Sequence, residues 1–170
     1  ALPISGVYMA AVEKGVRQAL EDGVVAGFPV HDARVIVHDG KSHAVDSKDI
    51  AFFSAGRKAT IEAIRAASPI ILEPVVDIEI LAPDASVGDL AGDLSSKRGQ
   101  VTGTQPRGVG TMSIGGKVPL AELDDYQGRL KSLTGGQGAY TIAFSHYAPV
   151  PVQTQQQLAS QHKAVVLEDD

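Results

Sequence analysis

The 170-residue chain contains no cysteine. This absence excludes disulfides, thiolate nucleophiles and thiolate metal ligands, but it does not identify a compartment, because secreted proteins can also lack cysteine. No apolar run approaches the ~20 residues that a membrane-spanning helix requires, and the first residues lack the basic-then-apolar order of a signal peptide. We therefore expect a cytoplasmic protein without a membrane partner. The chain opens on Ala1 instead of methionine, which favours a fragment of a longer protein.

A basic excess is also missing. Lysine and arginine total 15 against 20 acidic residues, so the net charge is −5. Nucleic-acid-binding domains usually carry a positive excess, so any RNA contact must be local. One stretch without acidic residues holds four cations: Lys97, Arg98, Arg107 and Lys117. From charge alone, the ordinary interpretation of this stretch is a solvated face.

The sequence has no P-loop. That motif needs a glycine-rich loop followed by Lys and Ser or Thr, because backbone amides and an ammonium group must surround the phosphates. The glycines at 108–110 lie inside an expected hairpin, and those at 135–138 follow an expected helix. Both clusters are better explained as turns. We therefore expect no nucleotide hydrolysis and no catalytic residue in this chain.

Histidine spacing does not indicate a metal site. His31 and His38 are an odd number of residues apart in an expected strand, so their side chains would face opposite ways. His146 and His162 have no carboxylate pair at ligand spacing. The Ser145-His146 pair lacks a nucleophile-elbow context, so spacing does not support a catalytic triad.

His43 is the histidine with a functional interpretation. It follows Lys41 and Ser42 between an Asp39-Gly40 turn and an expected helix N-terminus. A loop that joins a strand to a helix lies at the edge of a domain, where its side chains can contact a partner. A surface histidine without a task remains the alternative at this point.

Helix, strand and helix are expected in the first third of the chain. Apolar residues recur at helical spacing over 8–22, and Gly23 can end that helix. Residues 29–39 alternate as in a strand and lead into Asp39-Gly40. A second helix is expected after an N-cap at Asp46 or Ser47, ending before Pro69.

The pattern from Pro74 to Tyr147 predicts the order βαββαβ. Residues 76–80 alternate as a strand, and a helix begins near Pro83 and ends at Gly99. Extended segments at 100–105 and 109–118 form a hairpin with its turn at 106–108. A helix from Pro119 ends at Gly135-Gly136, and 139–147 form the last strand. The expected buried helix positions are Val87, Leu90, Leu94, Leu120, Leu123, Tyr126 (or Gln127), Leu130 and Leu133.

This order predicts an α+β fold. Right-handed crossovers turn βαββαβ into a four-stranded antiparallel sheet with two helices on one face, the ferredoxin-like arrangement. Beyond Pro151, residues 153–166 form a further helix candidate, and the acidic tail at 168–170 should fray.

Seven motifs, taken together, resemble domains IV and V of elongation factor G. Their order and spacing along nearly the whole chain follow that family, which makes chance agreement implausible. The motifs are YMAAVEKG (8–15), AGFPV (26–30), DGKSHAVDS (39–47), LEP (72–74), GDLAGDLSSKRG (88–99), VPLAEL (118–123) and LKSLTGGQG (130–138).

The resemblance implies a division into three parts. Residues 1–69 would be a truncated two-layer domain IV, the arm that enters the ribosomal decoding centre and displaces transfer RNA. Residues 70–150 would be the ferredoxin-like domain V, and 151–170 a C-terminal helix and tail. Lys41, Ser42 and His43 would form the tip that contacts ribosome and transfer RNA. GTP and Mg²⁺ would bind a catalytic domain of the parent protein upstream, leaving this part without a cofactor or metal.

The implied partner is the ribosome, including ribosomal RNA, ribosomal proteins and transfer RNA, contacted by a monomer. The expected ribosomal-RNA contacts are Lys97, Arg98 and Arg107 together with the backbone at Gly135 and Gly136, since phosphates can be met by a few local cations and amides.

Several departures from the family pattern favour a divergent paralogue. Asp124 and Asp125 add acids, while Lys131 and Gln137 replace the usual arginines. Fewer cations facing RNA weaken binding at physiological salt. The alternatives are therefore a recycling, rescue or antibiotic-protection factor of the same superfamily, and an unrelated ferredoxin-like domain for sensing or protein association.

Overall fold

The computed structural model describes residues 6–41 and 48–162. The chain divides into two compact units, the first made of residues 1–71 with 151–170 and the second of residues 72–150. Within the described residues, no helix has the length and apolar character needed to cross a membrane.

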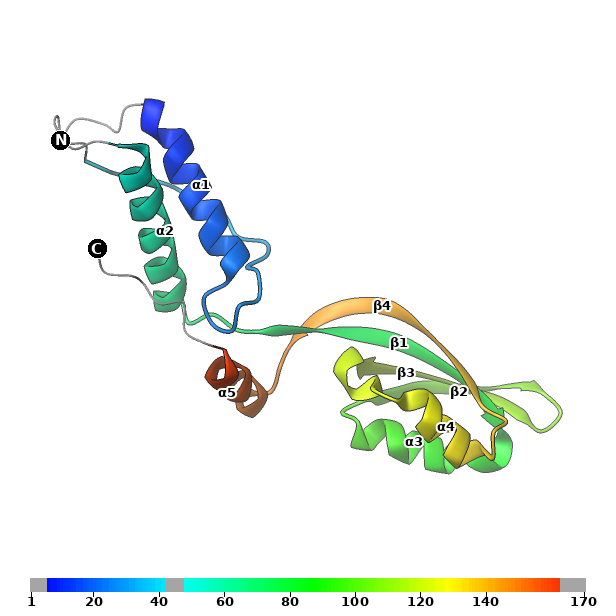
Figure 1. The fold of residues 1–170 in the computed structure, drawn as a ribbon. Helices are drawn as coiled ribbons and strands as arrows, with labels where there is room; N and C mark the ends of the chain where they lie inside the picture. Colours follow the sequence, from blue (N-terminus) through cyan, green and yellow to red (C-terminus); the bar gives the residue numbers. More distant parts are fainter. Residues whose placement is uncertain (1–5, 42–47, 163–170) are drawn as a thin grey trace. The chain divides into compact units, whose positions relative to one another are not determined.

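The second unit is a four-stranded antiparallel sheet with the strand order β2-β3-β1-β4. Helices α3 and α4 lie on one face of this sheet (Figure 1). The predicted βαββαβ order and ferredoxin-like arrangement are therefore confirmed. The elements are β1 (Leu72–Pro83), α3 (Val87–Ser96), β2 (Gln100–Gly108), β3 (Thr111–Pro119), α4 (Tyr126–Thr134) and β4 (Ala139–Pro149).

Strand β1 supplies the centre of the core. Val76, Ile78 and Ile80 are buried against the helices, whereas Asp77 and Glu79 alternate with them and are exposed. Full burial of one such aliphatic side chain contributes about 1.5–3 kcal/mol. The remaining core side chains are Ala82, Leu90, Leu94, Ile114, Val118, Leu123, Tyr126 and Leu130.

The hairpin turn is not at its predicted position. Pro106 and Arg107 lie inside β2, and the turn falls at Val109-Gly110, where Gly110 adopts a φ of 71°. Glycine takes this left-handed conformation without steric cost. Because β2 is an edge strand, it can also hold a proline that lacks an N–H group. The prediction of a turn at 106–108 was therefore wrong.

The helix expected from Pro119 is two elements. A 3₁₀ turn, η2 (Leu120–Leu123), precedes α4, and Asp125 between them adopts a left-handed φ of 50°. This conformation breaks the helical path, and Leu120 remains 42% exposed, contrary to prediction. Tyr126 is buried as predicted. A similar turn, η1 (Asp84–Ser86), precedes α3.

The first unit contains helices α1 (Gly6–Asp22), α2 (Asp49–Ala66) and α5 (Val152–Gln161). Helices α1 and α2 pack side by side through glycines. A Cβ atom at Gly15 would lie 2.1 Å from the carbonyl oxygen of Phe53, and one at Gly56 would lie 2.7 Å from that of Val12. Backbone contact this close requires residues without a side chain.

Side chains extend the α1–α2 contact on both sides of the glycines. Tyr8 stacks on Phe52 with ring centroids 4.3 Å apart, and Arg57 pairs with Asp22 at 2.9 Å. The Arg57 hydrogen bond lowers the pKa of the Asp22 carboxyl. Helix α5 joins this unit through Gln155, whose Oε1 accepts from the Ile71 amide at 2.9 Å.

The strand expected at 29–39 is absent from the described structure. The segment has no regular secondary structure, and Val35, Ile36 and Val37 are 45%, 55% and 43% exposed. A strand requires a neighbouring strand for its backbone groups, and the described residues of this unit contain none; the Val30 amide donates instead to the carbonyl oxygen of Leu20 in α1 at 2.8 Å. Alternation alone was therefore an insufficient predictor here.

Two helix ends in the first unit also differ from expectation. Lys48 is the N-cap of α2, in place of Asp46 or Ser47, and those two positions lie outside the described residues. Helix α5 ends at Gln161, inside the predicted range of 153–166, and residues 163–166 of that range lie outside the described residues.

Substitution Gly15→Ala is expected to destabilise the first unit. The added methyl group would overlap the α2 backbone, which cannot rotate away, so we expect a loss of about 2 kcal/mol in unfolding free energy. Urea unfolding followed by circular dichroism measures this loss. Gly92→Ala is the matched control, because its Cβ meets nothing within 4 Å and should add about 0.5–1 kcal/mol. Equal stability of the two variants would contradict the close-packing account.

Candidate functional site

The residues expected to contact RNA lie at separate places in the fold. Lys97 and Arg98 follow α3, Arg107 lies near the end of β2, and Gly135 and Gly136 follow α4, all in the second unit. Lys41 is exposed in the first unit. The other two residues of the expected tip, Ser42 and His43, lie outside the described residues.

Arg98 is held by carboxylates of the same unit. It adopts a left-handed φ of 57°, which costs a non-glycine residue about 1 kcal/mol or more. Its two terminal nitrogens donate to the two oxygens of Glu73 at 2.5 and 2.9 Å, and its Nε donates to Glu122 at 2.7 Å. Glu73 is only 8% exposed. Hydrogen bonding to Glu73, opposed by burial, raises the pKa of Arg98. The Arg98 guanidinium therefore links the end of α3 to Glu73 in β1 and to Glu122 in η2.

Lys97 has a weaker internal contact. Its Nζ donates to the Glu122 carbonyl oxygen at 3.1 Å and lies 6.0 Å from the centre of the Tyr126 ring. An ammonium group has three donors, so donors remain for another acceptor.

Burial raises the pKa of Tyr126 to about 12, and the nearby Asp93 carboxylate adds to this effect. The phenol is therefore neutral at physiological pH.

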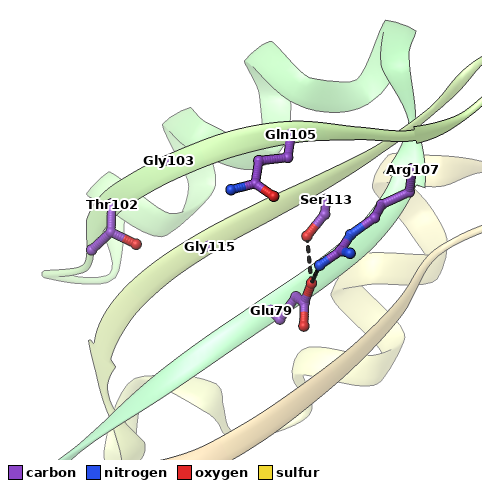
Figure 2. Close-up of a pocket in the computed structure, with 7 residues that line it drawn as sticks. All are labelled: Glu79, Thr102, Gly103, Gln105, Arg107, Ser113 and Gly115. Atoms are coloured by element: carbon purple, nitrogen blue, oxygen red, sulfur yellow. Dashed lines mark hydrogen bonds and ion pairs between the residues drawn. The ribbon is translucent and has the colours of Figure 1, made fainter.

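Arg107 lies on the sheet face that α3 and α4 do not cover. Its Nη2 donates to Oε1 of Glu79 at 2.8 Å, and the Ser113 hydroxyl donates to the same oxygen at 2.6 Å (Figure 2). The Ser113 bond, followed by the Arg107 bond, lowers the pKa of Glu79. The carboxylate is therefore ionised at neutral pH.

Gly135 and Gly136 form the C-cap of α4. Their φ angles are 60° and 86°, a conformation for which glycine is favoured. The Gly136 amide donates to the carbonyl oxygen of Lys131 at 2.9 Å. A phosphate contact through the Gly136 amide would have to replace this capping bond.

A second polar group lies on the open sheet face around Lys117. Its Nζ donates to Asp77 and to the Ser145 hydroxyl oxygen, at 2.5 and 2.8 Å, and that oxygen lies 3.0 Å from Nδ1 of His146. The Lys117 hydrogen bond lowers the pKa of Asp77. Asp77 pairs with lysine, so it does not orient the imidazole as the acid of a catalytic triad would. Residues 6–41 and 48–162 contain no cluster of three or more potential metal ligands from His, Cys, Asp and Glu.

Most cations of the second unit are paired with acids. Four of the six, Arg98, Arg107, Lys117 and Arg129, make ion pairs, and Lys97 and Lys131 do not. The partners Asp77 and Glu79 come from β1 across the sheet. The sequence interval from 97 to 117 contains no acid, but distance along the chain does not measure separation in a folded sheet. The alternation of Asp77 and Glu79 in β1 was the signal that could have predicted these partners.

Two protein families match successive parts of the chain. The family described as "Elongation factor G, domain IV" matches residues 3–68, and "Elongation factor G C-terminus" matches residues 70–158. A similar solved structure, of a protein from Thermus thermophilus, has a TM-score of 0.78 and 41% sequence identity. The similarity covers 93% of this chain and 24% of that one.

Curated relatives show the same extent of similarity. An "Elongation factor G-like protein" from Thermotoga maritima is 39% identical over 163 residues, covering 96% of this chain and 24% of the relative. An "Elongation factor G" from Aquifex pyrophilus is 42% identical over 157 residues, covering 92% and 22%. The chain thus spans about a quarter of the length of these relatives. It carries the domain IV and C-terminal regions in their family order, and it belongs to the elongation factor G family.

Proposed function

We propose that this chain is the ribosome-contacting C-terminal part of a GTP-driven translocase that moves transfer RNA and messenger RNA. The observation that carries the proposal is the match of both family regions, in order, along residues 3–158. The parent protein would bind GTP and Mg²⁺ in a catalytic domain outside this chain. GTP hydrolysis there would drive a movement that this part transmits to RNA in the cytoplasm.

The first unit would act as the arm of the translocase. Lys41, Ser42 and His43 would contact transfer RNA in the decoding region. An imidazole can donate and accept hydrogen bonds, so His43 suits a contact with a ribose or phosphate group. The glycine-mediated packing of α1 against α2 would keep the base of the arm rigid.

The second unit would contact ribosomal RNA, with unequal roles for the proposed residues. Lys97 keeps donors free for a phosphate. Arg98 and Arg107 each retain N–H groups beyond those that bind Glu73, Glu122 or Glu79. Gly135 and Gly136 would act by shaping the turn, since both adopt a positive φ and the Gly136 amide already caps α4.

A second candidate function is ribosome recycling, rescue or antibiotic protection. It is favoured by the pairing of four of the six cations in the second unit, together with the added acids Asp124 and Asp125. Single-round movement of transfer and messenger RNA on pre-translocation ribosomes distinguishes the two functions. GTP turnover by the full-length protein without such movement would favour the second candidate.

Substitution His43→Ala in the full-length protein is expected to slow single-round translocation about tenfold, the effect of losing ~1.4 kcal/mol of transition-state stabilisation. Ribosome affinity should remain, because the other contacts are unchanged. Stopped-flow fluorescence of labelled messenger RNA measures the rate. His38→Ala is the control, an exposed histidine in the same segment. An unchanged rate for His43→Ala would refute its assignment as the tip residue.

Lys97 and Arg98 are expected to respond differently to alanine. Lys97→Ala should leave folding intact. It should make the slope of log K for ribosome binding against log salt concentration smaller by about 1, the change expected for one lost phosphate contact. Arg98→Ala should lower the unfolding free energy by about 2 kcal/mol, because it leaves the buried Glu73 carboxylate unpaired.

Binding at several salt concentrations and urea unfolding test the two substitutions together. Arg98→Ala combined with Glu73→Gln should recover part of the lost stability, because the unpaired charge is then removed. Full stability of Arg98→Ala would show that the ion pairs of Arg98 with Glu73 and Glu122 do not stabilise this unit. An unchanged salt slope for Lys97→Ala would remove Lys97 from the RNA contact.

A further inference from the structure

A hollow of about 250 Å³ lies on the uncovered face of the sheet (Figure 2). Three neighbouring strands line it, and α3 and α4 lie on the other face. In Figure 2, Arg107 of β2 and Ser113 of β3 point toward Glu79 of β1, and Gln105 and Thr102 lie farther along β2. The lining residues are Glu79, Thr102, Gly103, Gln105, Arg107, Ser113 and Gly115.

Glu79 presents a fixed acceptor to this hollow. Its Oε1 already accepts hydrogen bonds from Ser113 and Arg107, and Ser113 is only 6% exposed. These two bonds fix the orientation of the carboxylate. Across the described ranges 6–41 and 48–162, no residue donates to Oε2. The second oxygen is therefore available to donors of a ligand.

Glycines make the floor of the hollow flat. Gly103 and Gly115 are paired across β2 and β3. A Cβ atom at Gly103 would meet nothing within 4 Å, and this residue does not adopt a positive φ, so the fold itself does not require glycine there. A Cβ atom at Gly115 would lie 3.2 Å from Oγ1 of Thr102, so the open space for a planar group is over Gly103.

Charge balance favours a neutral ligand. Glu79 and Arg107 form an ion pair at 2.8 Å. A cationic ligand in the hollow would therefore be repelled by Arg107, and an anionic ligand would be repelled by Glu79. A neutral planar group with adjacent N–H donors avoids both repulsions. Guanine has this arrangement, since its N1–H and N2–H₂ groups lie side by side on one edge and can both point at Oε2, the carboxylate oxygen that Ser113 and Arg107 leave free. Gln105 and Thr102 at the rim can bond its remaining polar atoms.

We propose that this hollow binds an unpaired guanine base of RNA, with Glu79 accepting hydrogen bonds from the guanine edge and Gly103 leaving space for the ring. The proposal deepens the proposed function and rests on it for the choice of RNA as the partner. Recognition of splayed bases through their polar edges is a general mode of binding single-stranded RNA.

The test uses the 170-residue chain and the oligoribonucleotides UUGUU and UUAUU at one fixed salt concentration. Amide chemical shifts from residues 102–107 and 113–115 locate binding, and titration gives the affinities. We expect UUGUU to bind about tenfold more tightly than UUAUU, because adenine has an acceptor in place of the N1–H donor and would present it to the Glu79 carboxylate. Equal affinities, or shifts that avoid these residues, would overturn the proposal.

Two substitutions examine the two parts of the hollow. Glu79→Gln keeps an oxygen for Ser113 and Arg107 but replaces the free acceptor by a donor amide, so the preference for guanine should disappear. Gly103→Val fills the floor with a strand-compatible side chain and should abolish binding of both oligonucleotides at this place. Gly108→Val is the matched control in the same strand, because its Cβ also meets nothing within 4 Å and it does not line the hollow. It should bind like the unmodified chain.

The remaining outcomes separate this proposal from its alternatives. Tighter binding at these residues by an arginine-containing peptide than by UUGUU would overturn it in favour of a protein partner. Retained ribosome binding by the full-length protein after loss of guanine preference would leave the proposed function intact. Guanine preference in a protein that does not bind ribosomes would instead support the hollow and refute the proposed function.

Discussion

The alternation of side chains along β1 is the constraint on which the second unit depends. Because successive residues face opposite sides of a sheet, Val76, Ile78 and Ile80 bury the core while Asp77 and Glu79 must lie on the uncovered face. A shift of one residue would expose the first group and bury the second. The same period that forms the core therefore determines where the acids meet the cations of neighbouring strands.

The order of elements in the second unit could be predicted because it depends on local periodicity. The breaks within that order could not. Asp125 separates η2 from α4 by adopting a left-handed conformation that aspartate takes in only a minority of cases. Pro106 suggested a turn, yet it lies in an edge strand, and the edge position of β2 depends on the whole sheet. The missing strand at 29–39 has the same cause, since pairing is a property of two segments.

The candidate site was less predictable than the fold because its chemistry depends on contacts between distant residues. Lys97, Arg98 and Arg107 were identified as a group by the absence of nearby acids in the sequence. In the structure, Glu73 and Glu79 of β1 form ion pairs with Arg98 and Arg107, whereas Lys97 bonds only a backbone carbonyl oxygen. The interpretation of His43 rests on the family motif, and the surroundings of that residue lie outside the described part of the chain.

The pairing of cations changes how RNA binding by the second unit should be understood. Salt-dependent affinity comes from cations that displace counterions at phosphates, and an arginine already neutralised by a carboxylate contributes less to that displacement. With only Lys97 and Lys131 unpaired among its lysines and arginines, the fully described second unit has little capacity for nonspecific attraction to RNA. Shape and neutral hydrogen bonding then become the larger sources of recognition. The polar sheet face around Glu79 can supply both, because Arg107 and Ser113 fix the carboxylate while Gly103 leaves the backbone accessible.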